Sequence, residues 1–397
     1  MIRALPLLLL ATPACAQSFT WGERNTDLAP AFAQQFRAPL ATTDVEIAQD
    51  VLAGGLVHPW GIAVLPGGAG YLVTERSGDL RHLSVDGTLS DPIAGVPEVL
   101  AERQGGLLDV AVGPTFADDR AVFLTYAKPM GDGRSATAAA RATLSDDRTA
   151  LSDVVDIFVQ DPPSPTPMHY GSRIVFLPDG TAALTTGEHS SRRERVFAQD
   201  LDKTYGKVAR VALDGTAPSD NPFVGQAGAV DTIWSYGHRN IQGAAVAPDG
   251  TLWTIEHGPA GGDELNRPEA GLNYGWPVIS YGENYDGSEV GSGEAAREGM
   301  EQPVYFWDPV IAPGGMMFHQ GAAFGDWNGD LLIGSLYPGG VVRLSLDAEG
   351  RVVEEERLLR DVGRVRDVEV LEDGTFLILT DFENGSVIHV RPKDAEG

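Results

Sequence analysis

Cysteine is nearly absent from this sequence of 397 residues, in which Cys15 is the only one. A single cysteine forms no disulfide within the chain and supplies no thiolate cluster for a metal. Basic residues are also few, 29 against 56 acidic ones, and the formal net charge is −27 at pH 7. Such an acidic surface repels phosphate backbones and anionic lipids, so neither nucleic acid nor a membrane surface is an expected partner.

Long hydrophobic runs are absent as well. The longest, Leu5–Ala11, follows Arg3 and falls far below the roughly 20 residues of a membrane span. Ala14-Cys15-Ala16 has the small residues of a signal-peptidase site, so residues 1–16 are predicted to be a secretory signal peptide. A lipoprotein signal that makes Cys15 the first mature residue is the alternative. We therefore expect a periplasmic or secreted protein without a membrane span.

The rest of the sequence lacks any long amphipathic helical pattern. Short apolar runs of β type alternate with turns rich in Gly, Asp and Pro, which indicates an all-β fold. Six similar units recur, each with two or three predicted strands. They begin at Gly61–Gly68, Leu107–Gly113, Ser172–Pro178, Gly243–Pro248, Gly321–Phe324 and Asp367–Leu371.

Six small antiparallel sheets around one axis bury their faces against each other and protect their edges by closing into a ring. The sequence therefore predicts a six-bladed β-propeller over residues 46–397, preceded by an arm at residues 17–45. The uneven spacing of the units predicts insertions in the loops at the active-site end, most heavily from Asn273 to Gln320. An array of β-sandwiches is the alternative fold.

Two polar motifs precede predicted strands. His169-Tyr170-Gly171-Ser172-Arg173 leads into the third unit, and a histidine there suits a general base because its pKa lies near neutrality. The motif Tyr236–Gly243 leads into the fourth unit and contains adjacent Arg239 and Asn240, which suit a flat ligand rich in carbonyl or anionic groups. Taken singly, a structural histidine and a loop-bracing arginine are the alternatives.

Two further clusters suit ions. Glu256–Glu264 and Gly271–Pro277 combine flexible backbone carbonyls with carboxylates, the oxygen ligands that calcium prefers. Arg364 and Arg366 stand two residues apart on an extended segment, so their side chains point the same way and can clamp carboxylates of a ligand. A plain turn and pairing with surface acids are the respective alternatives.

In combination these motifs resemble the soluble quinoprotein aldose sugar and glucose dehydrogenases. The resemblance extends from His58-Pro59-Trp60-Gly61 to the last unit, and its most specific parts are Tyr236–Gly243, His257–Glu264 and Asn273–Pro277. It implies a six-bladed propeller that holds pyrroloquinoline quinone (PQQ) and calcium and oxidises aldoses to lactones. It also implies an external electron acceptor, either a quinone or a small redox protein, and we expect a monomer or a homodimer.

The resemblance also implies residue roles. His169 corresponds to the catalytic base, and Arg239 to the group that stabilises developing negative charge. The carbonyls of Gly258 and Pro259 correspond to ligands of the cofactor calcium, and Glu264 and Tyr274 to a second calcium site. The residues matched to cofactor contacts are Gln104, His169, Arg239, Asn240, Tyr285, Tyr337, Arg364 and Arg366.

Three positions depart from the glucose dehydrogenases of this family. Tyr337 stands in place of a lysine that contacts the cofactor, Met168 in place of an acid, and Gly187-Glu188-His189 in place of a glutamine-containing turn. These departures favour a substrate other than glucose alone. Two other functions stay open: a calcium-dependent propeller lactonase, which needs no quinone, and a propeller that binds ligands without catalysis.

Overall fold

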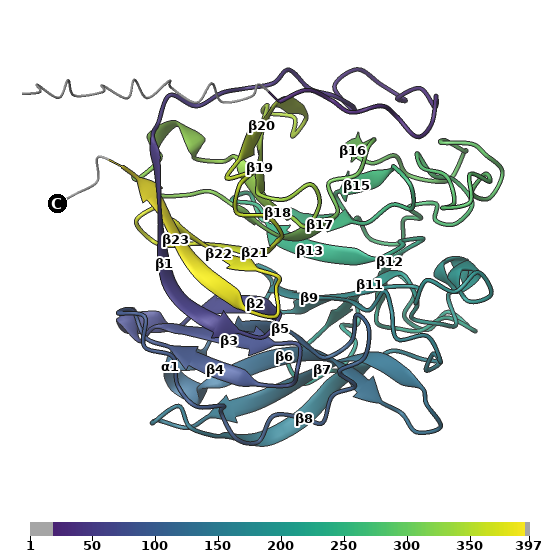
Figure 1. Ribbon diagram of the computed structural model, residues 1–397. Coiled ribbons are helices and arrows are strands. Elements are labelled where there is room, and N and C mark those ends of the chain that lie inside the picture. Colours follow the sequence, from purple (N-terminus) through teal and green to yellow (C-terminus); the bar gives the residue numbers. More distant parts are fainter. Residues whose placement is uncertain (1–18, 394–397) are drawn as a thin grey trace, which may run out of the picture.

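The computed structural model describes residues 19–393, so the predicted signal peptide lies outside the described residues. Six antiparallel sheets each place one edge strand at a central channel, and these inner strands contact one another in a closed ring. The fold is a six-bladed β-propeller, as predicted (Figure 1). The inner strands are β2 (Pro59–Val64), β5 (Leu107–Val112), β9 (Gly171–Phe176), β13 (Ile241–Val246), β17 (Pro313–Phe318) and β21 (Val365–Val370).

Each blade continues outward from its inner strand through antiparallel neighbours. In blade order these are β3 (Tyr71–Glu75) and β4 (Leu80–Leu83); β6 (Ala121–Pro129), β7 (Ser135–Leu144) and β8 (Leu151–Val159); β10 (Ala182–Thr186), β11 (Lys207–Val211) and β12 (Ile233–Tyr236); β14 (Leu252–Glu256), β15 (Asp263–Asn266) and β16 (Tyr305–Trp307); β18 (Leu331–Ser335), β19 (Val341–Leu346) and β20 (Val352–Leu358); β22 (Phe376–Thr380) and β23 (Gly385–Pro392). The short helices are η1 (Pro66–Gly68), α1 (Phe116–Asp119), η2 (Arg195–Gln199) and η3 (Gly325–Trp327).

The two ends of the described chain close the ring. Strand β1 (Ile47–Leu56) is the outermost strand of the last blade and pairs antiparallel with β23, from Ile47 opposite Pro392 to Leu56 opposite Gly385. The purple and yellow strands therefore lie side by side in Figure 1. This pairing joins strands from opposite ends of the sequence and protects the edge at which the ring closes.

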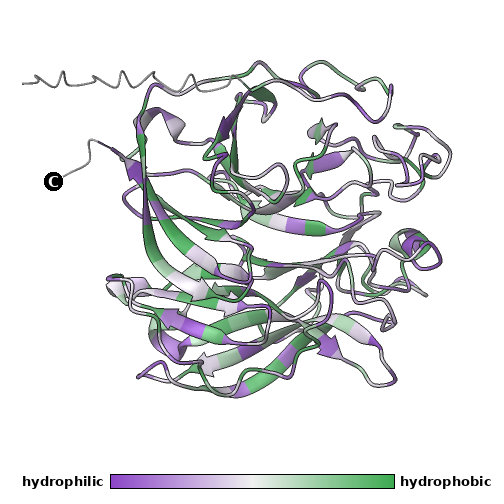
Figure 2. Ribbon diagram, viewed as in Figure 1, coloured by the Kyte–Doolittle hydropathy of each residue, from purple (hydrophilic) through white to green (hydrophobic). Residues whose placement is uncertain are grey.

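The core lies between blades. One apolar cluster joins Leu72 of the first blade to Val110, Leu124 and Ala140 of the second, and a matching cluster joins the fourth and fifth blades. Figure 2 shows green, apolar stretches along many of the strands. Since burying one large aliphatic side chain contributes roughly 1.5–3 kcal/mol, these interfaces hold the blades, and with them the loops at their ends, in fixed positions.

One strand prediction is wrong. The inner strand of the fifth blade is β17 at Pro313–Phe318, whereas Gly321–Phe324 forms turns before η3. The region from Asn273 to Gln320 is accordingly not one insertion, because it also contains β16. The reason is local: β17 begins Pro-Gly-Gly, and a Cβ at Gly315 would lie 1.7 Å from the Asp367 carboxylate of the neighbouring inner strand. The neighbouring inner strand is so close that only glycine fits at this position. Because glycine has no apolar side chain, the alternating apolar pattern that indicates a strand is missing here.

Residues 19–45 form an extended segment without strands that runs beside the fourth and fifth blades (Figure 1). Isolated bridges join Phe36 to Phe306 and Leu40 to Glu355, and the Asn25 amide donates to Asp308 Oδ1 at 2.8 Å. In residues 19–393 no helix is long and apolar enough to cross a membrane.

Candidate active site

The segments that precede the inner strands meet at one end of the central channel. Gln104, Asn240, Ala312 and Arg364 each stand just before an inner strand, and together they line a cavity of about 190 Å³ that we call the channel cavity. The long loops after β10 and β15 project at the right of Figure 1. They contribute to a second cavity of about 310 Å³, the loop cavity, which Glu188, Arg239, Pro259 and Tyr285 line.

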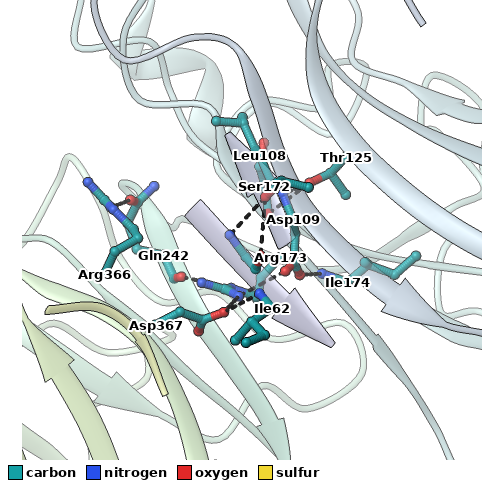
Figure 3. A network of polar contacts seen from close by, with 12 residues as sticks. Ile62, Leu108, Asp109, Thr125, Ser172, Arg173, Ile174, Gln242, Arg366 and Asp367 are labelled. Carbon is teal, nitrogen blue, oxygen red and sulfur yellow. Dashed lines mark hydrogen bonds and ion pairs between the residues drawn. The ribbon is translucent and has the colours of Figure 1, made fainter. Parts of the chain in front are cut away.

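Arg173 lines a larger cavity of about 630 Å³ at the other end of the channel. Its Nη1 donates hydrogen bonds to Asp109 at 2.9 Å and to Asp367 at 3.1 Å, and all three side chains are buried (Figure 3). Burial raises the pKa of Asp109 to about 6, although the Arg173 charge opposes the shift. Gln242 links this group to the channel cavity, since its carbonyl accepts from Arg173 and its Oε1 from Arg366.

His169 forms a buried pair with Glu188. Its Nδ1 lies 2.8 Å from Glu188 Oε1, and the two residues are only 5% and 1% exposed. The histidine backbone has φ of 47°, in the left-handed region that β-carbon-bearing residues avoid, and its N–H donates to Gln104 Oε1 at 2.9 Å. Gly187 packs directly on it, since a Cβ there would lie 1.9 Å from the His169 carbonyl oxygen. The ring is therefore held in one position.

The electrostatics of this pair suit a general base. Burial, and then the Arg239 charge, hold the pKa of His169 well below its usual value. Burial raises the pKa of Glu188 to about 7, although Arg239, His189 and Arg195 oppose the shift. An ionised Glu188 accepts a hydrogen bond from Nδ1–H of the neutral ring, so that the free lone pair of the imidazole is on Nε2. Within residues 19–393 no group hydrogen-bonds Nε2, so it is free to receive a proton.

Arg239 and Asn240 lie side by side between the two cavities. Arg239 Nη1 donates to the His257 carbonyl at 2.9 Å, and the guanidinium lies 5.2 Å from the ring centre of Trp276. Asn240 Oδ1 accepts the Gly171 N–H at 3.0 Å. The Arg239 Nε and Trp276 Nε1 atoms are buried without a hydrogen-bond partner in the described part of the chain. Such groups are rare in folded proteins, and these two donors are available to a ligand.

Arg364 and Arg366 point the same way, as their spacing predicts, and both donate to Asp381 Oδ2, at 2.9 and 2.7 Å. His58 completes the group at 2.9 Å from the other Asp381 oxygen. Burial alone would raise the pKa of Asp381, but Arg366 and the hydrogen bonds from Arg364 and His58 outweigh it and hold the pKa far below its usual value. One carboxylate thus orients two arginines at the channel cavity and leaves an excess positive charge there.

The predicted calcium ligands surround a small buried space. Gly258, Glu264 and Tyr274 line a cavity of about 10 Å³, while Pro259 faces the loop cavity. Burial and the neighbouring Glu256 carboxylate raise the pKa of Glu264 well above its usual value, as expected where a cation is needed. The Tyr274 hydroxyl already donates to the Arg267 carbonyl, so only the main-chain carbonyl of this tyrosine suits an ion.

No group of three or more acidic, histidine or cysteine side chains with metal-site geometry occurs in residues 19–393. A cation here would therefore depend on backbone carbonyls. Gly258 is shaped for that purpose, because a Cβ would lie 2.2 Å from Gly262, so only glycine fits the turn.

The two predicted tyrosine contacts lie at the periphery. Tyr285 is 77% exposed at the rim of the loop cavity. Tyr337 is 67% exposed and lies outside the lining of the channel, loop and small cavities, although its neighbour Leu336 lines the channel cavity. The structure thus brings the other predicted residues to these cavities or, for His169, to their edge, and leaves Tyr337 apart.

Several residues of the site were not predicted from the sequence. Arg76, Trp60 and Gln242 line the channel cavity, and Glu188 holds His169. Gln242 could have been predicted from the sequence. It stands two residues after Asn240, and side chains two residues apart on a strand point to the same side. Arg76 and Glu188 lie in loops without a local signal.

A family comparison agrees with this geometry. The glucose/sorbosone dehydrogenase model matches residues 56–389, which include every residue of the site. The chain belongs to the glucose/sorbosone dehydrogenase family. Aldose sugar dehydrogenase YliI of Escherichia coli K12 is 42% identical over 358 residues, which cover 89% of this chain and 94% of that protein. Its name places the chain among relatives that are sugar oxidoreductases.

Two solved structures of family members are similar throughout. The soluble aldose sugar dehydrogenase of Escherichia coli in its apo form has a TM-score of 0.85 at 41% identity, covering 88% of this chain and 100% of that one. The PQQ-bound aldose sugar dehydrogenase of Streptomyces coelicolor has a TM-score of 0.71 at 26% identity, with the same coverage of 88% and 100%. The chain is thus similar in structure to a protein that binds PQQ.

Proposed function

We propose that the protein is a PQQ- and calcium-dependent aldose dehydrogenase that oxidises the anomeric carbon of a sugar to the lactone. The observation that carries the proposal is the buried His169–Glu188 pair, in which no group of residues 19–393 hydrogen-bonds Nε2 of the histidine. Glu188 lines the loop cavity, and Tyr170, next to His169 in sequence, lines the channel cavity. The PQQ-bound relative supports the choice of cofactor.

The residues present fit this cofactor. PQQ carries three carboxylates, and Arg76, Arg364 and Arg366 line the channel cavity. Buried Nε atoms of Arg366 and Arg239 have no partner among residues 19–393, and leaving such donors unpaired costs about 1–3 kcal/mol each. Arg364 and Arg366 would hold ligand carboxylates, while Asn240 and Gln104 offer amides to ring carbonyls. Tyr285 borders the loop cavity, whereas Tyr337 is near the channel cavity only through its neighbour Leu336.

The carbonyls of Gly258 and Pro259 would hold the cofactor calcium, since main-chain oxygens are ligands that calcium accepts. Glu264 and the Tyr274 carbonyl would hold a second, structural ion, which would neutralise the buried Glu256 and Glu264 carboxylates. When bound, PQQ with its calcium would supply the acceptor for the hydride, and thus for the two electrons, that leave the sugar carbon.

The chain's own residues manage the proton and the charge. His169 Nε2 accepts the proton of the anomeric hydroxyl, and the carboxylate of Glu188 stabilises the resulting imidazolium through Nδ1–H. Arg239 supports negative charge that develops opposite the base. Loss of one proton and one hydride converts the hemiacetal carbon to the lactone, and the electrons then pass to an external acceptor, either a quinone or a small redox protein.

We also propose that residues 1–16 direct export and are removed, that residues 17–45 form an arm, and that residues 46–397 form the catalytic domain of a periplasmic or secreted monomer or homodimer. An antibody against residues 46–397 should find the protein outside the cytoplasm. Full retention of unprocessed chain in the cytoplasm would contradict export.

The test of function is reconstitution. The chain from residue 17 is purified, supplied with PQQ and calcium, and assayed for aldose-dependent reduction of a redox dye. We expect activity, and we expect His169→Ala to lower turnover by about 100- to 10,000-fold while PQQ binding persists. Bound PQQ without oxidation of any aldose contradicts the proposal, and lactone hydrolysis without PQQ would favour a lactonase.

A further inference from the structure

The loop cavity beside His169 has a charge opposite to that of the molecule. Arg192, Arg195 and Arg239 line it, against the two carboxylates of Glu188 and Asp286. The chain as a whole carries a net charge of −27. A positive opening on so acidic a protein focuses anions toward the site.

Arg195 is one of two arginines of this group that have no acidic partner within residues 19–393. Its Nη1 donates to Asn284 Oδ1 at 2.8 Å, and its guanidinium lies 5.6 Å from the ring centre of Trp276. It forms no ion pair within residues 19–393, whereas Arg192 pairs with Asp286 at 2.6 Å. Arg239 lies over the same indole at 5.2 Å. Two guanidinium groups therefore flank one tryptophan, and neither has an acidic partner among these residues.

The cationic groups also act on one another. Burial lowers the pKa of Arg195; Glu188 opposes this shift, and the charges of Arg192 and Arg239 add to it. The single charge of the Glu188 carboxylate offsets only part of the three positive charges. An anion bound between these arginines would relieve their repulsion.

We propose that the loop cavity takes an aldose carrying an anionic group remote from its anomeric carbon, and that Arg195, assisted by Arg192, binds that group. The inference rests on the proposed function, since the anomeric end must face His169. The volume of about 310 Å³ is at the lower end of the range for small-molecule sites, about 300–1,000 Å³, and suits a monosaccharide. The chemistry fits either a carboxylate or a phosphate, because arginine binds both in the same forked geometry.

The kinetic test compares kcat/KM of the reconstituted enzyme for glucose, glucuronate and glucose 6-phosphate. Arg195→Gln should lower kcat/KM for the preferred anionic sugar by about 10- to 100-fold, the range of one charge-assisted hydrogen bond, with less than about a threefold change for glucose. Arg193→Gln is the matched control: it removes the same charge from the same loop, and Arg193 is exposed and lies outside the cavity lining. The two anionic sugars distinguish carboxylate from phosphate.

A binding test needs no turnover. Calorimetric titration of the full chain with methyl glucuronoside and methyl glucoside, neither of which has a free anomeric hydroxyl, should show tighter binding of the anion. The difference should shrink in 0.5 M salt, because partly exposed charges are screened, and vanish in Arg195→Gln. A methyl glycoside phosphate replaces the glucuronoside if kinetics favour the phosphate.

Equal losses for neutral and anionic sugars in Arg195→Gln, or weaker PQQ binding in that variant, would overturn the inference, as would loss of the preference in Arg193→Gln. If no aldose is oxidised but the anionic glycoside still binds through Arg195, the proposed function fails and the anion site stands. If neutral aldoses alone are oxidised and bound, the function stands and the anion site fails.

Discussion

Replacing Glu188 with glutamine separates two contributions of this residue to the proposed base. Glutamine keeps a carbonyl oxygen at the position of Glu188 Oε1, 2.8 Å from His169 Nδ1, and can accept the same hydrogen bond. The substitution removes only the negative charge. Since both residues are buried, water cannot replace that charge, and the imidazolium formed by proton transfer loses its stabilising partner.

The magnitude follows from the environment. A hydrogen bond to a charged group contributes about 1.5–3 kcal/mol and a neutral one about 0.5–1.5 kcal/mol, and low local polarity enlarges the difference. A loss of roughly 1–3 kcal/mol from the transition state corresponds to an approximately 5- to 150-fold decrease in kcat. Substrate KM should change little, because the charge matters only after the proton has moved.

The pH profile supplies a second readout. Protonation of the pair puts a hydrogen on Nε2 or removes the charge of Glu188, so activity should rise with pH through an apparent pKa near 7 that belongs to the pair. In Glu188→Gln only His169 titrates, and burial and Arg239 hold its pKa well below the usual value. The acidic limb should therefore move to lower pH while the plateau falls. A variant with unchanged plateau and limb would refute the assignment.

Three further predictions follow from particular contacts. Gly187→Ala should lower kcat/KM at least tenfold, because its Cβ would lie 1.9 Å from the His169 carbonyl oxygen and would displace the histidine; Gly54→Ala, whose Cβ would meet only Ser386 Oγ at 3.6 Å, is the control and should keep full activity. Tyr337→Lys should tighten PQQ binding by about tenfold in an equilibrium titration, since it adds a cation beside the channel cavity; unchanged affinity would show that position 337 does not reach the cofactor. Burial raises the pKa of Asp109 to about 6, so this group favours the folded state below about pH 4 and loses that contribution as pH rises through 6. Asp109→Asn should reduce the difference in unfolding free energy between pH 4.5 and pH 7 by on the order of 1–3 kcal/mol in urea titrations, and an unchanged difference would contradict the shift.

Much of the fold could be predicted because propeller blades are local. Each blade packs strands that follow one another in sequence, and five of the six predicted units begin at or near an observed inner strand. The exception, β17, shows the limit: Gly314 and Gly315 are required by contact with Arg366 and Asp367, which are some 50 residues away in sequence. The pairing of β1 with β23 could not be predicted either, because the two strands lie at opposite ends of the described sequence and no local pattern links them.

The residues of the candidate site likewise fall into two groups: those that a local motif predicts and those that only tertiary packing brings to the site. Arg239, Asn240 and the pair Arg364 and Arg366 belong to motifs beside inner strands, where sequence order and spatial order agree. Glu188 lies in a loop, and its pairing with His169 depends on packing between Gly187 and the histidine backbone. Asp381 likewise meets Arg364 and Arg366 only because β22 and β21 are antiparallel neighbours.

The buried charges beneath the channel cavity explain how Arg366 is held in place before a ligand binds. Arg173 takes two carboxylates and stands 4.4 Å from the ring centre of Trp60, and Arg366 stands 5.7 Å from the same ring. Gln242 connects the two arginines by hydrogen bonds. Arg366 is thus held by Gln242 and Trp60, which belong to other blades, and by the ion pair with Asp381. Positive charge is then aimed at the cavity before any ligand arrives, which lowers the ordering cost of binding a carboxylate.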